Sequence, residues 1–495
     1  MKKRKFLKLM SAMLAVLMLI PLAVSCGKEN SEETQASVQT QDAAEERLPL
    51  TVAKEDNGGK EFNILTVASN NLDIADESST SVVDIALRAA DVMVEEHLGI
   101  TMTYGTLPGD WNDRNSFNTQ LMLMSMTGDA QYDLILAKSG SSYSYVLQNN
   151  IVYDLASLED LQLDSPWYLK DMIGTYGING KLFAARGDAS LTTYSNFGVV
   201  FFNEGLIDEY KLESPYNLVN SDEWTVEKMF EMALKVGSSN TGMEPNLSTD
   251  SFGYIGHHTA SRGWMIALDV ILYEKNAQDG NYYMKTALDQ STLDKWQYMY
   301  DMVENNQSAI IVPGEADVED GHANYESGRS LFYQNYLGYS TNLKSVDWSW
   351  GVLPMPKYDA DQKALYTPAA GGLISFILNS AKDAELSAKV LEVKSYYNYY
   401  DVVPSYYEDT LGYQVASSQR HIDMLEIIRE NATITYLAAT SANMTPDPWI
   451  VFQLDEYIRN GTTSEASLGG NLNTWYAGRK DMWNNYLKTL YSKLK

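Results

Sequence analysis

The chain has 495 residues, of which 45% are hydrophobic and 21% charged, a composition typical of globular proteins. A single hydrophobic core is unusual at this length, so we expect at least two domains. The 65 acidic residues outnumber the 37 basic residues and give a formal net charge of −28, which disfavours binding to nucleic-acid phosphates.

The first residues have the pattern of a bacterial export signal. A basic segment at residues 2–8 precedes an apolar run at residues 9–24, which is too short for a membrane span. Small residues then lead to Cys26. Because Cys26 is the single cysteine of the chain, an intrachain disulfide and a cysteine-based zinc cluster are excluded. This pattern resembles a bacterial lipoprotein signal, which implies removal of residues 1–25 and lipid attachment to Cys26. An ordinary signal peptide with an incidental cysteine is the alternative.

The next segment is rich in Glu, Ser, Gln and Ala and has few large apolar residues. Such a segment buries too little surface to offset the entropy lost on ordering. We therefore predict that residues 26–60 form a disordered tether between the lipid and the folded body.

The following region predicts a lobe of alternating strands and helices. The expected elements, in order, are a strand at 62–68, a helix at 81–98 ended by Gly99, a strand at 100–104, a helix at 115–126 and a strand at 132–137. The first helix has Ile85, Ala89, Val92 and Met93 in helical period, and we expect this face to be buried. Residues 138–143 stand at the end of the third strand. The alternation predicts an α/β lobe with a largely parallel sheet.

A second lobe is expected to begin with the apolar run at residues 197–202. Asn203 can cap a helix that starts at Glu204, and Thr225 can cap another that Gly237 ends. Further elements are helices at 264–275, 292–304 and 381–396, strands within 328–333, 348–353 and 373–378, and a mostly helical region from residue 421.

Taken together, these segments resemble the extracellular solute-binding proteins of bacterial ABC importers, in particular the maltose-binding-like carbohydrate group. The resemblance extends over nearly all of residues 61–495. Its segments are the lipoprotein signal with its tether, residues 132–137, 180–184, 198–203 with Trp224 and Thr225, 328–333, 350–356 and 371–378. These segments are specific to the family and not to one ligand.

The resemblance implies a periplasmic-binding-protein-like type II fold, with two α/β lobes joined by a multi-crossing hinge and a ligand cleft between them. It places the N-lobe at residues 61–194 plus 367–432 and the C-lobe at 195–366 plus 433–495, with the hinge at 192–197. It implies a monomeric binding protein without cofactor, metal or catalysis. Such a protein captures a small solute, typically an oligosaccharide, and delivers it to an ABC permease at the outer face of the cell membrane.

A sugar site needs aromatic faces for C–H groups and planar polar groups for hydroxyls. The chain has 34 Tyr and 10 Trp against 12 Phe. Matching family positions gives the candidate ligand-binding residues Ser69, Asn70, Lys138, Tyr143, Asn196, His257, Trp264, Tyr336 and Trp449. Asn196 departs from the family, in which an acidic residue is frequent here, although an amide still forms hydrogen bonds. We expect Trp449 to stack on the ligand.

Other functions stay open at this point. A secreted glycan-active enzyme needs only two well-placed carboxylates. The sequence lacks Gly-x-Ser-x-Gly, His-Glu-x-x-His and Gly-x-x-x-x-Gly-Lys motifs. A surface lipoprotein that captures glycans without transport is a further alternative, as is a family member with a ligand other than sugar. His257 and His258 have no third ligand at metal-binding spacing.

Overall fold

The computed structural model describes residues 47–69, 71–110, 112–128, 131–170, 172–237, 245–257, 261–369, 371–415, 419–434 and 472–494. The chain divides into two compact units, residues 1–51 and 52–495, and the second is described below. The predicted export signal and Cys26 lie outside the described residues. Among the described residues, no helix has the length and apolar character needed to cross a membrane.

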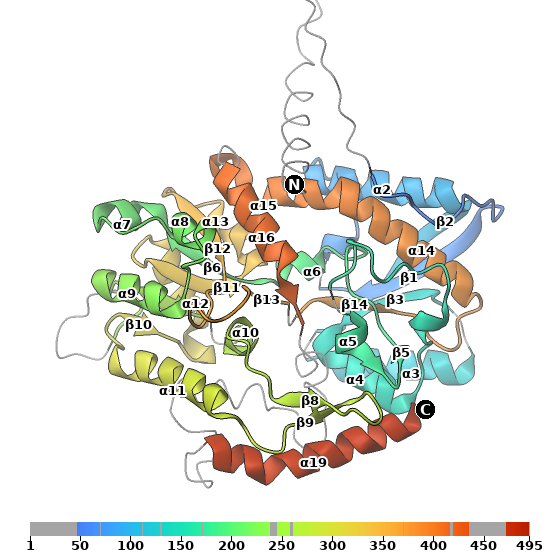
Figure 1. The fold of residues 1–495 in the computed structure, drawn as a ribbon. Coiled ribbons are helices and arrows are strands. Elements are labelled where there is room, and N and C mark those ends of the chain that lie inside the picture. Colours follow the sequence, from blue (N-terminus) through green and yellow to red (C-terminus); the bar gives the residue numbers. More distant parts are fainter. Residues whose placement is uncertain are drawn as a thin grey trace, which may run out of the picture. The chain divides into compact units, whose positions relative to one another are not determined.

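The first sheet has the strand order β14-β3-β1-β2 (Figure 1). Its strands are β1 (Lys60–Val67), β2 (Ile100–Leu107), β3 (Leu134–Lys138) and β14 (Leu373–Phe376). β1 is parallel to both β2 and β3, whereas β14 is antiparallel to β3. The α/β lobe with a largely parallel sheet is therefore confirmed. The second half of β1, residues 64–67, and most of β3 are buried, as expected of central strands covered on both faces.

Helix α2 (Val82–Leu98) has the predicted ends but not the predicted buried face. Ser81 accepts a hydrogen bond from the Asp84 backbone N–H, and Gly99 ends the helix at φ 60°. The predicted face is wrong, because Ile85 and Val92 are half exposed. The residues that are buried instead are Val83, Leu87, Ala90, Val94, His97 and Leu98. Two apolar stripes share this helix, and the one with the leucines faces the protein interior.

The other elements of this lobe connect its strands or follow β3. They are η1 (Asn71–Asp73), α3 (Arg114–Thr127), α4 (Ser139–Asn149), η2 (Leu155–Ser157), α5 (Met172–Tyr176), β4 (Gly177–Ile178) and β5 (Lys181–Leu182). α4 begins directly after β3, so residues 139–143 at the end of this strand form the start of a helix. Packing also begins before the predicted start at residue 61: Val52 is buried and Glu55 pairs with Lys389 at 2.5 Å.

The second sheet has the order β10-β7-β11-β6-β12. Its strands are β6 (Gly198–Asn203), β7 (Tyr254–Gly256), β10 (Ile310–Ile311), β11 (Phe332–Tyr336) and β12 (Trp350–Pro354). The predicted caps are confirmed, since Asn203 accepts from the Leu206 N–H and Thr225 from the Lys228 N–H. The associated helices are α7 (Glu204–Glu209), α8 (Pro215–Asn220), α9 (Val226–Val236), α10 (Ser261–Ala267), α11 (Gln290–Asn305), η3 (Glu315–Asp317), α12 (Val318–Glu326), η4 (Leu337–Tyr339) and α13 (Ser340–Leu343).

The helix predicted at residues 264–275 is partly wrong. α10 ends at Ala267, and Asp269 adopts a left-handed φ of 53° that breaks the helical path. The chain then forms a hairpin of β8 (Tyr273–Lys275) and β9 (Tyr282–Met284). This local reversal explains why an apolar periodic run did not continue as a helix.

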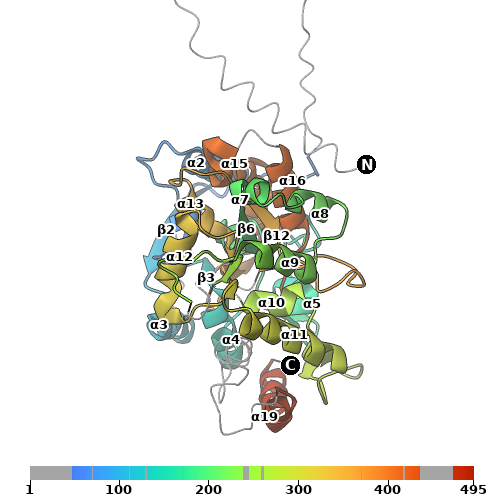
Figure 2. The same ribbon diagram turned by 90° about the vertical axis from the view of Figure 1, so that its left-hand side faces the viewer.

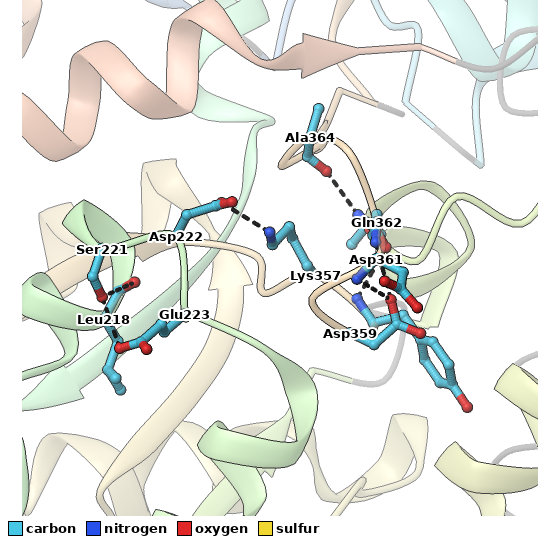
Figure 3. Close-up of polar contacts among 11 residues, drawn as sticks. Leu218, Ser221, Asp222, Glu223, Lys357, Asp359, Asp361, Gln362 and Ala364 are labelled. Carbon is cyan, nitrogen blue, oxygen red and sulfur yellow. Dashed lines mark hydrogen bonds and ion pairs between the residues drawn. The ribbon is translucent and has the colours of Figure 1, made fainter.

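Two segments that carry the family resemblance are joined through Lys357, just after β12 (Figure 3). The Val226 N–H donates to the Lys357 carbonyl at 2.8 Å, and the Lys357 N–H donates to the Trp224 carbonyl at 3.1 Å. The buried Lys357 ammonium pairs with Asp222 Oδ1 at 2.8 Å. The segment after β12 therefore fixes the start of α9.

The two sheets are connected by several crossings. The first runs through α6 (Thr192–Ser195), and the second through β13 (Thr367–Pro368), which is parallel to β15 (Ala432–Thr433). The remaining helices are α14 (Ala384–Tyr397), the π-helical turn η5 (Asn398–Val402), α15 (Val403–Val415), α16 (Gln419–Glu430) and α19 (Leu472–Lys493). The two-lobe α/β fold with a multi-crossing hinge is thus confirmed. α16 contacts β12, and its Met424 joins the core beside the second sheet, although the prediction placed it in the N-lobe.

Candidate ligand-binding site

A polar cluster lies where the strands of the first sheet end. Ser69 follows β1, Lys138 ends β3, and Asp110 lies just after β2. Ser69 Oγ donates to Asp110 Oδ1 at 2.5 Å, and Lys138 Nζ pairs with the same oxygen at 2.6 Å. The hydrogen bonds from Lys138 and Ser69 hold the pKa of Asp110 below its ordinary value. The carboxyl ends of parallel strands form the usual ligand edge of an open α/β sheet.

Two predicted residues, Ser69 and Lys138, thus meet through a third residue that the sequence analysis missed. The available signal was the position of Asp110 soon after a predicted strand, matching the positions of the other two. All three side chains are partly or largely exposed, so a ligand can reach them. Asn70 lies outside the described residues.

Asn196 lies where the first crossing approaches the second. It ends α6, and its Nδ2 donates to the Thr192 carbonyl at 2.9 Å and to Ser195 Oγ at 3.2 Å. A Cβ at Gly371 would lie 2.4 Å from Asn196 Oδ1, so a larger residue at this position would displace the Asn196 amide. The amide therefore stabilises its own turn, while its oxygen faces the second crossing.

The second sheet places His257 and Tyr336 together at its own strand ends. His257 follows β7 and Tyr336 ends β11, the parallel neighbour of β7. Their ring centroids are 5.8 Å apart in an edge-to-face arrangement. Together with Gly198, Gly263, Gln334, Asn335 and Pro368 they line a narrow pocket. Its volume of ≈ 10 Å³ is about that needed for one water molecule. Pro368 brings the second crossing to this pocket.

Tyr143 and Trp264 lie in the interior of the protein instead. Tyr143 is fully buried on α4, and its hydroxyl donates to the Tyr176 carbonyl at 2.5 Å. Trp264 is buried on α10, and its Nε1 donates to the Tyr254 hydroxyl at 3.3 Å. Both aromatic rings are covered by their own lobes, and the structure brings neither to the groups at the strand ends. Trp449 lies outside the described residues.

A buried network fixes the first crossing, and the sequence analysis missed it. Tyr194 donates to Asp188 Oδ1 at 2.5 Å, and Arg429 Nη2 pairs with Asp188 Oδ2 at 3.0 Å. Arg429 Nε also donates to the Tyr194 hydroxyl at 2.7 Å. Burial raises the pKa of Asp188 to about 6, although the Arg429 charge acts in the opposite direction. The network ties α16 to the chain just before α6.

A second buried carboxylate holds the other side of this crossing. Asp73 accepts hydrogen bonds from Ser190 Oγ at 2.8 Å and from Thr192 Oγ1 at 2.9 Å. Burial raises the pKa of Asp73. The crossing is therefore fixed to the first lobe, and the residues that follow it lead into β6 of the second.

Comparison with known proteins gives a likeness of fold. No protein-family model and no curated protein sequence matches the chain. The GacH receptor of Streptomyces glaucescens, solved unliganded and with acarbose, has a TM-score of 0.53 at 13% identity, covering 87% of this chain and 99% of that one. The maltose-binding periplasmic protein of Listeria monocytogenes, solved with maltose, has a TM-score of 0.54 at 12% identity, covering 88% and 98%.

A third solved structure has a similar TM-score and a similarly low sequence identity. The cyclic α-maltosyl-1,6-maltose-binding protein of Arthrobacter globiformis has a TM-score of 0.54 at 13% identity, covering 88% of this chain and all (100%) of the other. At these identities the likeness establishes the two-lobe fold.

Among the described residues of our chain, no group of three or more His, Cys, Asp or Glu side chains could hold a metal ion. The groups at the strand ends instead offer hydrogen-bond donors, acceptors and ring edges.

Proposed function

We propose that this chain is the substrate-binding subunit of an ABC importer and captures an oligosaccharide by closure of its two lobes. The observation that carries the proposal is the placement of reachable polar and aromatic groups at the ends of both sheets, next to the crossings. Asp110 and Lys138 lie at one sheet, and His257 and Tyr336 at the other. A ligand that contacts both lobes favours their closed arrangement.

The chemistry of these groups suits a neutral, hydroxyl-rich ligand. Asp110 and Lys138 together can accept from and donate to vicinal hydroxyls, and Tyr336 offers an aromatic surface. The structural neighbours described above were solved with acarbose or maltose, or are named for a cyclic maltosyl-maltose. We propose that Ser69, Asn70, Lys138, Asn196, His257, Tyr336 and Trp449 contact the ligand. Tyr143 and Trp264 would support these contacts from the core.

We also propose that Cys26 carries the lipid that anchors the protein at the outer face of the cell membrane, beside an ABC permease. Acyl chains anchor a protein without a membrane-spanning helix. Labelling cells with a palmitate analogue tests this proposal. We expect label on the wild-type protein, and release of an unlabelled protein from the membrane when Cys26 is changed to Ser. Label that persists in Cys26→Ser would contradict it.

A ligand screen tests the binding function. We expect a rise in melting temperature with linear α-glucans such as maltotetraose, because a ligand that binds the native state stabilises it in proportion to RT ln(1 + [L]/Kd). The same samples should contain intact oligosaccharide after prolonged incubation. Breakdown products would favour the glycan-active enzyme. Binding without any effect of the protein on uptake by cells would favour glycan capture without transport.

A further inference from the structure

We propose that the β8–β9 hairpin and α19 form a clasp that holds the two lobes together at a place separate from the crossings. We infer that Asn179 and Asn281 are positioning residues, which set ligand affinity through this clasp without touching the ligand. The inference rests on the proposed function insofar as lobe closure captures a ligand. The contact between the lobes can be tested without any ligand.

On one side, the hairpin and α19 behave as a single body built on the core of the second lobe. The Tyr476 hydroxyl donates to the Leu272 carbonyl at 2.9 Å and to the Lys285 carbonyl at 2.8 Å, on the two sides of the hairpin. The Met284 N–H donates to Asn484 Oδ1 at 2.7 Å. Trp475 of α19 is buried in the same core as α10. α19 and the hairpin are therefore parts of the second lobe and move with it.

On the other side, Asn179 lies in the turn between β4 and β5 of the first lobe. Its backbone N–H donates to Asn281 Oδ1 at 2.8 Å, and Asn281 Nδ2 donates to Asn179 Oδ1 at 2.7 Å. Asn179 Nδ2 also donates to the Tyr491 carbonyl of α19 at 2.9 Å. The Asn281 side chain is only 2% exposed, so water does not replace these bonds while the clasp is closed. One amide thus contacts both the hairpin and α19.

A second set of contacts lies along α4, the helix after β3. Gln148 Nε2 donates to the Tyr486 hydroxyl at 2.7 Å, and Lys493 Nζ donates to the Gln148 carbonyl at 3.2 Å. Figure 1 shows α19 extending to the region of α4, and Figure 2 shows the two helices close together from the side, in agreement with the contacts between them. The clasp therefore joins the lobes at two neighbouring points.

These bonds have a consequence for affinity. They are formed at the present separation of the lobes, so they favour this arrangement over a wider one. A ligand that bridges the lobes favours the same arrangement, and its apparent affinity depends on the population of that arrangement. Loss of the clasp should therefore weaken binding roughly tenfold, mainly through faster dissociation, as expected for one or two lost hydrogen bonds.

Two variants of the full chain open the clasp with little change elsewhere. Asn179→Gly removes the amide at a position with φ 54°, which glycine adopts without strain. Tyr486→Phe removes only the hydroxyl that accepts from Gln148. The matched control is Asn305→Ala on α11, whose side chain donates to the Asp301 carbonyl within its own helix at 2.9 Å.

The first measurement is small-angle X-ray scattering of the unliganded proteins. We expect a larger radius of gyration for Asn179→Gly and Tyr486→Phe than for the wild type, and no change for Asn305→Ala. A purely structural role would lower the melting temperature and leave the radius of gyration unchanged, and this result would overturn the proposal. A larger radius of gyration in both variants would show that the increase does not come from partial unfolding of one of them.

The second measurement is the dissociation rate of maltotetraose. We expect a roughly tenfold faster rate in both clasp variants and an unchanged rate in the control. Unchanged dissociation in both clasp variants would overturn the role in affinity. If the wild-type protein binds none of the oligosaccharides in the screen, the proposed function fails, whereas scattering still decides whether the clasp holds the lobes together.

Discussion

Two ion pairs near the crossings have opposite environments. At the end of the first sheet, Lys138 and Asp110 pair with side chains that are 32% and 45% exposed. Beside the first crossing, Arg429 and Asp188 pair with side chains that are 18% and 3% exposed. The distances are similar, 2.6 Å and 3.0 Å, so the two pairs differ mainly in their access to water.

This difference in exposure distinguishes an ion pair that a ligand can reach from an ion pair that stabilises the fold. An exposed pair contributes little to stability, and water or a ligand hydroxyl can replace either partner. A buried pair gains little when both partners are present, but removal of one partner leaves an unpaired charge in the interior. We therefore expect Lys138 to affect binding more than folding, and Arg429 to affect folding more than binding.

The largest effect should follow Arg429→Met. The change leaves Asp188 buried without its cation, and we expect a loss of about 3–5 kcal/mol in the free energy of unfolding at neutral pH. Chemical denaturation measures this loss. The exposed pair Lys60–Asp383 supplies the control, since Lys60→Met should cost at most about 1 kcal/mol. A similar cost for the two variants would show that burial does not distinguish the pairs.

The effect of Arg429→Met should depend on pH. Burial raises the pKa of Asp188 from 3.8 to about 6, so its ionisation in the folded state costs stability as the pH rises through 6. Without Arg429 this pKa rises further. At pH 5 the carboxyl of the variant is then protonated, and no unpaired charge is buried. We therefore expect a smaller deficit at pH 5 than at pH 8, and an equal deficit would contradict this account.

The next largest effect should follow Lys138→Met, now on binding. Hydrogen bonds to charged groups contribute about 1.5–3 kcal/mol, which corresponds to a loss of roughly 10- to 100-fold in oligosaccharide affinity. Calorimetry with the best ligand from the screen measures it, and denaturation should show little change. Lys285→Met is the matched control, because Lys285 forms a similarly exposed pair with Asp289 on the β9–α11 segment, with side chains that are 23% and 50% exposed. Equal affinity of Lys138→Met and the wild type would remove Lys138 from the proposed site.

A smaller effect on affinity is expected from Trp449→Ala. A stacked aromatic contributes about 0.5–1.5 kcal/mol beyond the area that it buries, so we expect a loss of about tenfold in affinity. The same calorimetric titration measures it. Unchanged affinity would make Trp449 a structural residue.

The sequence predicted most of the elements and only part of the site. Short-range signals were reliable: the predicted caps Asn203 and Thr225 both accept the expected hydrogen bonds. The end of the third strand was predicted as well, which put Lys138 at the edge of the first sheet. His257 came from the family resemblance, because no strand was predicted before it. Which face of α2 is buried depends on what packs against it, and periodicity alone chose the wrong stripe.

Contacts between distant parts of the chain could not be predicted. Arg429 and Asp188 are 241 residues apart, and nothing near either residue indicates the other. Trp264 and Tyr143 were taken from family positions, and the resemblance alone does not show that both are buried within their own lobes. The amides of the clasp, Asn179 and Asn281, lie in turns where asparagine is common for local reasons.

The smallest effect should follow Asp289→Asn, which tests how little an exposed pair contributes. Asparagine keeps the cap of α11 but loses the charge that pairs with Lys285 at 2.8 Å. The hydrogen bond from Lys285 lowers the pKa of Asp289 from 3.8 to about 2, so its contribution is present above pH 3.8 and is lost as the pH falls through 2. Because the pair is exposed, we expect a change of about 0.5 kcal/mol or less at pH 7, measured by denaturation, and less still at pH 2. A loss as large as that of Arg429→Met would mean that exposed pairs also hold this fold together, and Lys138 would then be bound too firmly to Asp110 to exchange it for a ligand.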